Sequence, residues 1–410
     1  MKGRATAPSS KSYTIRALLA GALADGNSYV SNPLYSDDTW AAIEILRNLG
    51  ATTTIGESGI SIKGGSLHAT PATLDCRDSA ATLRFISAIC ATLPGVSALK
   101  AGTSLAQRPI LPLLEILGKM GASFTCKDNL IVINGGGLRG GIFKIKGDAS
   151  SQFISALLLI APLIGEDITY QLDAAPRSRP YIEMTIDTMY KYGVQINTSP
   201  DYTVFKTTAQ QYRPATFTVE GDWSSASYLL AAGAIAGEVT VEGLNLLSLQ
   251  GDKIIVSILQ KMGAAILPDS SSITTGLSQL HSINFDMSQC IDLLPTVAVC
   301  LATAEGTSCL SGISRARLKE SDRVHAIREG LFCMGIKTEE AEDKLIIHGG
   351  EPKEAIIDSF GDHRIAMAFA LLGLKTGGVT ITGAECVSKT FPSFWLALKT
   401  LGGKIKTDDE

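Results

Sequence analysis

The chain has 410 residues, of which 45% are hydrophobic and 19% charged, and its formal net charge is -4. This length predicts two or three domains, each with enough apolar residues for a core of its own. Aromatic residues make up only 6% of the chain, and the Lys and Arg residues form no run, which excludes a nucleic-acid-binding surface. Any anion that the protein binds should therefore be small.

The cysteines and histidines argue against disulfides and metal sites. The eight cysteines are dispersed and form no C-x-x-C pair, and none of the five histidines is followed by a second one four residues later. No stretch approaches the ~20 apolar residues of a membrane span. We therefore expect a cytoplasmic monomer with no metal and no membrane contact.

Six helix-like runs end in a glycine that follows Leu, Met or Tyr, which is typical of a left-handed helix stop. These glycines are Gly50, Gly121, Gly193, Gly263, Gly335 and Gly402, spaced by 71, 72, 70, 72 and 67 residues. Ala- and Leu-rich stretches that end at a second set of glycines recur in phase with them. The second set is Gly26, Gly95, Gly165, Gly237, Gly306 and Gly378. Two landmarks that recur together indicate six copies of one structural unit.

Each repeat is expected to hold an Ala/Leu-rich helix, a strand, an amphipathic helix and a strand pair. In the second repeat these are residues 79–95, 96–102, 109–122, 122–128 and 129–135. Helices that are apolar on nearly every side must be buried. We therefore expect an α/β (α+β) fold of two domains, each an inside-out α/β barrel of three βαβαββ-type repeats around buried helices. The expected domains are residues 10–220, and residues 1–9 with 221–410, with hinges near 9–11 and 219–222.

The starts of the six first helices hold polar residues that break the symmetry, at 9–16, 77–84, 147–153, 220–228, 290–296 and 360–367. A Ser or Asp there is explained by helix capping. Capping does not explain Lys11 or Arg364, because a cation is unfavourable at a helix N-terminus unless an anion is bound. Asp292 is either a cap or a functional carboxylate, and the charged run at 317–323 is either a solvated face or part of a site.

The glycine-rich segment at residues 135–140 satisfies G-x-G-x-x-G, but a strand-like run follows it where the dinucleotide fold needs a helix. The sequence predicts a hairpin turn there. No Walker A pattern occurs either. We therefore expect no cofactor.

Taken in order, nine short motifs resemble the enolpyruvyl transferases, and among them the branch that acts on shikimate 3-phosphate. They are P-S-S-K-S-x-x-x-R from 8, A-T-L-R from 81, Q-R-P from 107, S-S-Q from 150, S-R-P-Y from 178, E-G-D-x-S-S-A-S-Y from 220, L-K-E-S-D-R from 318, G-D-H-R-x-A-M from 361 and S-K-T-F-P from 388. The resemblance implies two domains that close on the substrates, shikimate 3-phosphate and phosphoenolpyruvate. It also implies transfer of the enolpyruvyl group to the 5-hydroxyl of shikimate 3-phosphate, with release of phosphate.

The resemblance also implies the roles of individual residues. Shikimate 3-phosphate would be held by Ser12, Arg16, Ser150, Ser151, Gln152, Ser178, Tyr181, Asp292 and Lys319. Phosphoenolpyruvate would be held by Lys11, Ala80, Arg108, Gln152, Arg323, Arg364 and Lys389, with Arg84 as support. Asp292 would be the base for the hydroxyl and Glu320 the acid for the methylene carbon. Lys389 and Lys11 would also act in catalysis, and His363 would orient its neighbours.

The chain departs from the family at the start of the first helix of the second repeat. Asp78-Ser79-Ala80-Ala81 stands where the family shows N-A-G-T or N-S-G-T. Ala80 adds a methyl group and Asp78 a negative charge near the implied phosphoenolpyruvate site, so glyphosate sensitivity does not follow from the resemblance. The segment before residue 8 is also short, which predicts that an edge strand is missing.

Two other functions compete with this reading. A sister transferase that acts on UDP-N-acetylglucosamine starts with Lys-Asn where this chain has Lys11-Ser12, and it carries a Cys in the loop at 99–109, where none occurs. A non-catalytic repeat protein that binds small anions would need neither Asp292 nor Glu320.

Overall fold

The computed structural model describes residues 1–406, and the chain divides into two compact units. The N-terminal unit is Ser9–Val219, and the C-terminal unit combines Met1–Pro8 with the chain from Glu220 onward. Each unit contains three sheets, and in the described residues the strands form separate sheets with no closed barrel. The α/β class expected from the sequence is confirmed.

One pattern is common to the first five repeats, whereas the described residues of the sixth form a two-stranded sheet and lack the strand pair expected from the sequence. A parallel edge strand, a buried helix and a central strand are followed by a second helix and an antiparallel strand pair. The central strand pairs in parallel with the edge strand and antiparallel with the last strand. Across each four-stranded sheet, the edge strand is followed by the central strand, then by the last strand of the repeat and finally by the strand that precedes that one in the chain.

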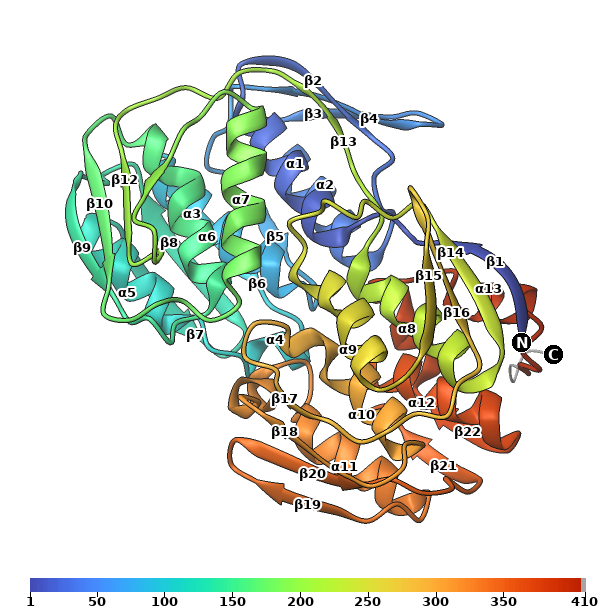
Figure 1. Cartoon of the computed structure of the whole chain (residues 1–410). Helices are drawn as coiled ribbons and strands as arrows, with labels where there is room; N and C mark the ends of the chain where they lie inside the picture. The colour runs from blue at the N-terminus through green and yellow to red at the C-terminus, as the bar shows by residue number, and fades with distance from the viewer. Residues whose placement is uncertain (407–410) are drawn as a thin grey trace. The chain divides into compact units, whose positions relative to one another are not determined.

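The N-terminal unit contains the first three repeats (Figure 1). The first comprises β13 (Thr216–Thr218), α1 (Lys11–Leu23), β2 (Gly26–Ser31), α2 (Asp37–Asn48), β3 (Thr52–Ile55) and β4 (Gly59–Gly64). The second comprises β5 (Thr73–Asp75), α3 (Ala80–Thr92), β6 (Gly95–Lys100), α4 (Thr103–Ala106), α5 (Leu111–Met120), β7 (Ser123–Lys127) and β8 (Leu130–Gly135). The third comprises β9 (Gly141–Ile145), α6 (Ser151–Ile160), the 3-10 helix η1 (Ala161–Leu163), β10 (Ile168–Leu172), α7 (Arg179–Lys191), β11 (Asn197–Thr198) and β12 (Val204–Thr207).

The C-terminal unit contains the other three repeats. The fourth comprises β1 (Lys2–Thr6), α8 (Trp223–Ala236), β14 (Glu238–Glu242), η2 (Gly251–Ile254), α9 (Ile255–Lys261), β15 (Ala265–Pro268) and β16 (Ser272–Gly276). The fifth comprises β17 (Asn284–Asp286), η3 (Ile291–Leu293), α10 (Leu294–Ala302), β18 (Thr307–Ser311), η4 (Ser314–Leu318), α11 (Arg323–Cys333), β19 (Thr338–Ala341) and β20 (Lys344–His348). The sixth comprises β21 (Ala355–Asp358), α12 (His363–Thr376), β22 (Val379–Thr382), η5 (Ala384–Lys389) and α13 (Phe394–Thr400).

The first helices of the repeats form the cores of the two units. In the C-terminal unit α8, α10 and α12 pack against one another, and every residue of α8 from Trp223 to Ile235 is buried. In the N-terminal unit α3 packs against α6, and α1 is buried from Tyr13 to Ala22. These helices are apolar all round because neighbouring helices and a sheet surround them. Their buried N-termini carry the polar residues considered next.

The helix stops are confirmed. All six glycines of the first set have a positive φ, from 77° at Gly335 to 124° at Gly121. A left-handed residue directly after the last turn suits glycine, because a Cβ would be strained there.

Two local expectations are wrong. The short N-terminus does form an edge strand, since β1 pairs in parallel with β14, with Lys2 opposite Glu238. The segment at 135–140 is not a hairpin turn, because β8 and β9, on either side of it, belong to different sheets. Both errors concern strand pairing, which depends on partners distant in sequence.

Candidate active site

Lys11 begins α1 in the N-terminal unit, directly after the N-cap residue Ser10. Its Nζ lies 2.8 Å from Oδ2 of Asp38, whose side chain is 4% exposed. The anion that a cation at this helix start requires is therefore a carboxylate of the protein itself. The sequence analysis missed Asp38, because an acidic residue in the first turn of α2 is explained by the helix dipole alone.

Arg16, one turn later on α1, is almost completely buried. Its guanidinium donates to Oγ1 of Thr185 at 2.7 Å and to the carbonyl oxygens of Ser12 at 2.9 Å and Tyr181 at 3.0 Å. Burial lowers the pKa of Arg16 to about 10, so it stays charged at neutral pH. Arg16 thus joins α1 to α7 and fixes the backbone of two residues expected to hold shikimate 3-phosphate.

The start of α7 departs from ordinary helix geometry. Ser178 is its N-cap and has φ of 53°, in the left-handed region that non-glycine residues rarely adopt. Ser178 is also buried. Strain of this kind persists only where the surroundings impose it, and it is common at ligand sites.

Arg84 connects the other two first helices of this unit. It donates to Oε1 of Gln152 on α6 and, at 2.9 Å, to the carbonyl oxygen of Pro109, and its guanidinium lies 5.0 Å from the centre of the Phe153 ring. Ser150 caps α6, its Oγ accepting the Gln152 amide at 3.3 Å, and Ser151, the first residue of α6, is buried. The capping role considered for this serine pair is therefore observed for Ser150.

Asp78 is engaged by the backbone of α4, the short helix that precedes Arg108. Its Oδ1 accepts the amide of Leu105 at 3.0 Å, and the amide of Arg108 donates to the carbonyl of Leu105 at 3.0 Å. Ala80 is the first residue of α3 and is 4% exposed. Asp78, where the chain departs from the family, thus fixes the loop that carries Arg108.

In the C-terminal unit Arg323 is the centre of a buried charge cluster. Its side chain is 1% exposed and contacts three carboxylates: Asp292 at 2.7 Å, Glu320 at 2.6 Å and Asp362 at 2.8 Å. Burial alone would lower the pKa of Arg323, but the three carboxylates outweigh it and raise the pKa. Five donors in a rigid fork make arginine the residue that can hold three acids together.

Asp292 lies in η3, at the entrance to α10, among three cations. Lys319 Nζ lies 3.1 Å from its Oδ1, and Arg364 lies 3.7 Å from its Oδ2 and donates to its carbonyl oxygen at 3.2 Å. Burial would raise the pKa of Asp292, but the charges of Lys319, Arg364 and Arg323 together hold it well below its usual range. Asp292 is therefore an ionised carboxylate that can accept a proton.

Glu320 has different neighbours. Its Oε2 accepts from Arg323, and its Oε1 lies 3.6 Å from Nζ of Lys389 at the end of η5. Lys319, next to it in the chain, points to Asp292 instead, and burial lowers the pKa of Lys319 to about 8. Two carboxylates in different cationic surroundings can take different proton-transfer roles.

The start of α12 binds this cluster to the core. Asp362 caps the helix, accepting the amide of Arg364 at 2.9 Å, and its Oδ2 also accepts from Ser321 at 3.1 Å. His363 is 1% exposed, with Nδ1 3.7 Å from Oδ1 of Asp362. The sequence analysis identified Asp362 only as a cap, because its partner Arg323 is 39 residues away.

Asp252, in η2, is a further buried carboxylate that the sequence analysis missed. It is 3% exposed and accepts a hydrogen bond from Ser224 on α8. Burial and the charge of Asp292 raise the pKa of Asp252 to about 6. An isolated Asp in a polar segment carries no sequence pattern that would single it out.

The predicted site residues are divided between the two units, and we call the two sets the N-terminal cluster and the C-terminal cluster. The N-terminal cluster comprises Lys11, Ser12, Arg16, Ala80, Arg84, Arg108, Ser150, Ser151, Gln152, Ser178 and Tyr181. The C-terminal cluster comprises Asp292, Lys319, Glu320, Arg323, His363, Arg364 and Lys389. Within residues 1–406, no group of three or more His, Cys, Asp or Glu side chains is placed to hold a metal ion. None of the helices in this range has the length and apolar character needed to cross a membrane.

Comparison with known proteins identifies the family. Residues 1–398 match the family model of EPSP synthase (3-phosphoshikimate 1-carboxyvinyltransferase). Curated relatives of that name include one from Dehalococcoides mccartyi, 46% identical with 99% of this chain and 97% of the relative covered, and one from Methanocaldococcus jannaschii, 38% identical with 99% and 97% covered.

Solved structures agree in fold. An EPSP synthase from Acinetobacter baumannii superposes with a TM-score of 0.82 at 26% identity, covering 99% of this chain and 96% of that one. The enolpyruvyl transferase NikO from Streptomyces tendae gives the same TM-score at 17% identity, with 99% and 96% covered, and supports the fold alone. Neither alternative function is favoured by these matches, and the chain belongs to the EPSP synthase family.

Proposed function

We propose that the protein transfers the enolpyruvyl group of phosphoenolpyruvate to the 5-hydroxyl of shikimate 3-phosphate and releases phosphate. The observation that carries this proposal is the C-terminal cluster, in which Arg323 holds Asp292 and Glu320 in different cationic surroundings. A protein that only binds anions would gain nothing from two buried carboxylates beside its cations.

The first step is an addition. Asp292 accepts the hydroxyl proton while the hydroxyl oxygen of shikimate 3-phosphate bonds to C2 of phosphoenolpyruvate. Glu320, in its protonated form, donates a proton to the C3 methylene. The product is a tetrahedral intermediate that still carries phosphate. The low pKa of Asp292 makes it a weak base while Lys319 is paired with it, and it would become a better proton acceptor if the substrate phosphate drew Lys319 away.

The second step is an elimination. Phosphate leaves C2 and takes up the proton that Asp292 had accepted, a proton returns from the C3 methyl group to Glu320, and the double bond forms again. Lys389, whose Nζ lies 3.6 Å from Oε1 of Glu320, would stabilise the departing phosphate together with Arg364. The remaining cations, Lys11 and Arg108 of the N-terminal cluster, would neutralise phosphoenolpyruvate.

Shikimate 3-phosphate would be held by the hydroxyl, amide and guanidinium groups assigned to it above. Arg16 fixes the backbone of Ser12 and Tyr181, and Ser150 fixes Gln152, so these ligands are positioned before the substrate arrives. No step requires a metal or a cofactor.

The test is phosphate release from shikimate 3-phosphate and phosphoenolpyruvate by the wild type and by Asp292→Ala, Glu320→Ala and Lys389→Ala. General acid–base catalysis is typically worth about 10²–10⁴-fold, so the two carboxylate variants should lose at least about 100-fold in kcat. Full turnover by Glu320→Ala would refute its role as the acid. Release only with UDP-N-acetylglucosamine as acceptor would refute the proposed function.

We further infer a cytoplasmic monomer. All eight cysteines are free thiols in the structure, which suits a reducing compartment. Light scattering on the purified protein would test the monomer, since a dimer would double the 43.2 kDa mass. Fractionation of cells would test the compartment.

A further inference from the structure

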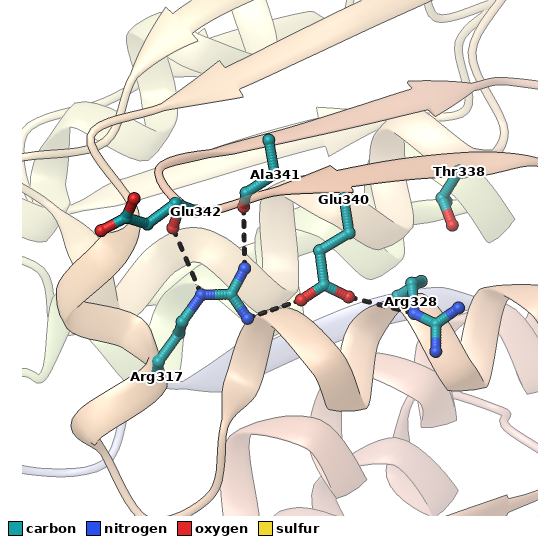
Figure 2. A pocket seen from close by; sticks show the side chains of 6 residues that line it. All are labelled: Arg317, Arg328, Thr338, Glu340, Ala341 and Glu342. Carbon is teal, nitrogen blue, oxygen red and sulfur yellow. Dashed lines mark hydrogen bonds and ion pairs between the residues drawn. The ribbon is translucent and has the colours of Figure 1, made fainter.

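A second charged network lies beside the C-terminal cluster, around an open pocket formed by α11, β19 and the end of η4 (Figure 2). Arg317 is its centre, and its side chain is 23% exposed. Its guanidinium contacts Oε1 of Glu340 at 2.5 Å and Oδ2 of Asp322 at 3.1 Å. It also donates to the carbonyl oxygens of Ala341 at 2.8 Å and Glu342 at 3.2 Å.

This pocket does not suit an anion. Arg317 and Arg328, the two cations that line it, both face Glu340, and Glu342 is also part of the lining. The side chains of Arg317, Glu340 and Arg328 form one chain of ion pairs, drawn as dashed lines in Figure 2. The pocket is therefore electrically balanced, and its role lies in what the arginine holds in place.

The ion pair between Arg317 and Asp322 encloses residues 318–321. Arg317 is the last residue but one of η4, and Asp322 is the N-cap of α11, where it accepts the amide of His325 at 3.0 Å. The enclosed segment carries Lys319 and Glu320, whose side chains reach Asp292 and Arg323. Both ends of the segment are thus held by one guanidinium.

The same guanidinium ties the segment to the hairpin of β19 and β20. The two carbonyl groups that it contacts, Ala341 and Glu342, lie where that hairpin turns, and Ser314 at the start of η4 donates its amide to Asp343 in the same turn at 2.7 Å. An ordinary surface ion pair contributes little stability, about 0–1 kcal/mol. A planar fork with two carboxylates and two carbonyls has a geometric role that a lysine cannot reproduce.

We propose that Arg317 is a positioning residue that holds Lys319 and Glu320 in their working geometry. This inference rests on the proposed function, in which Lys319 binds shikimate 3-phosphate and Glu320 transfers the methylene proton. Arg317 binds Asp322, Glu340 and two carbonyl groups rather than the charged group of Lys319 or Glu320, so it acts through the backbone of residues 318–322.

The test compares Arg317→Lys with Arg328→Lys as the matched control. Arg328 shares the partner Glu340, at 3.0 Å, but makes no contact with residues 318–322 that the structure records. We expect Arg317→Lys to lower kcat about 10-fold, equivalent to about 1.4 kcal/mol in the barrier. Its KM for shikimate 3-phosphate should rise while its KM for phosphoenolpyruvate changes little, because only Lys319 of the enclosed segment is a substrate ligand. Arg328→Lys should stay within about twofold of the wild type in all three constants.

A second readout is independent of activity. Hydrogen exchange of the His325 amide, which donates to the Asp322 side chain at 3.0 Å, should be faster in Arg317→Lys than in the wild type and unchanged in Arg328→Lys. If the wild type fails to release phosphate from the two substrates, the proposed function is wrong, and the exchange measurement still decides on Arg317.

The two variants distinguish a positioning role of Arg317 from an ordinary surface ion pair. If Arg317→Lys matches Arg328→Lys in exchange, the positioning role is refuted, whatever the kinetics show. If Arg317→Lys fails to fold, Glu340→Gln takes its place. This variant weakens the ion pair between Arg317 and residue 340 and leaves the contacts of Arg317 with the two carbonyl groups. Glu340→Gln should then show the same split in KM at smaller amplitude, and wild-type constants would overturn the proposal.

Discussion

Asp252 offers a test of how burial and charge compete in the C-terminal unit. The substitution Asp252→Asn keeps the shape of the side chain and an oxygen that can still accept from Ser224. It removes only the ability to ionise. Since burial raises the pKa of Asp252 from 3.8 to about 6, the folded protein holds this proton more tightly than the unfolded chain does.

The sign and size of the effect follow from linkage. The folded state is penalised as the pH rises from 3.8 to about 6, and the full penalty applies above pH 6. A rise of this size corresponds to at most about 3 kcal/mol. For a unit of this size, roughly 2–4 °C per kcal/mol converts that to a melting temperature that is higher in the variant by at most roughly 6–12 °C. At pH 4 most of the difference should be lost, because the wild-type carboxyl group is then protonated in the folded state and about half protonated in the unfolded chain.

The assay is thermal melting of the wild type and Asp252→Asn at pH 7.5 and pH 4. Asp269→Asn is the control, because Asp269 is exposed on the turn between β15 and β16 and should be neutral at both values. If Asp252→Asn melts at or below the wild-type temperature at pH 7.5, the reasoning is refuted. The attraction of Arg364 for the ionised carboxylate would then outweigh burial.

Three further substitutions test the site and the packing around it. Arg323→Lys leaves buried acids without a partner, so we expect the free energy of unfolding to fall by about 3–5 kcal/mol and kcat to fall at least about 100-fold. Thermal melting and phosphate release measure the two losses. Wild-type stability would contradict the role of the cluster. Because the pKa of Lys319 is lowered to about 8, kcat/KM for shikimate 3-phosphate should fall as the pH rises through 8 in the wild type and stay level in Lys319→Arg; parallel profiles would contradict this. In Gly330→Ala a Cβ would lie 2.2 Å from the Phe369 ring, so melting should show a loss of about 1–3 kcal/mol that Phe369→Leu partly restores; additive losses would contradict the steric explanation.

The sequence predicted the parts of the fold that depend on local chemistry. The six helix-stop glycines adopt a positive φ because the chain must turn there at once, whatever surrounds it. The all-round apolar helices are buried, as α8 shows along its length. The edge strand β1 could not be predicted from local sequence, because it forms by pairing with β14, more than 230 residues later.

In the candidate site, too, only residues with a local sequence signal could be predicted. Lys11 and Arg364 could be singled out, because a cation at a helix start conflicts with the local dipole. Their partners could not, because the contacts between Lys11 and Asp38 and between Arg323 and Asp362 exist only after the repeats have packed. Asp252 has no local pattern at all, and only its burial beside Asp292 makes it unusual.

These internal partners change how the cations should be understood. Lys11 is paired with Asp38, and Lys319 with Asp292, so each of these cations is already neutralised by a carboxylate of the protein. If both lysines bind substrate as proposed, the substrate would compete with a carboxylate at each position, which would lower its affinity while the cations stay oriented beforehand. Under the proposed function, Lys319 would leave Asp292, the carboxylate that accepts the hydroxyl proton, when it moved to the phosphate. Substrate binding would then also make Asp292 a stronger base.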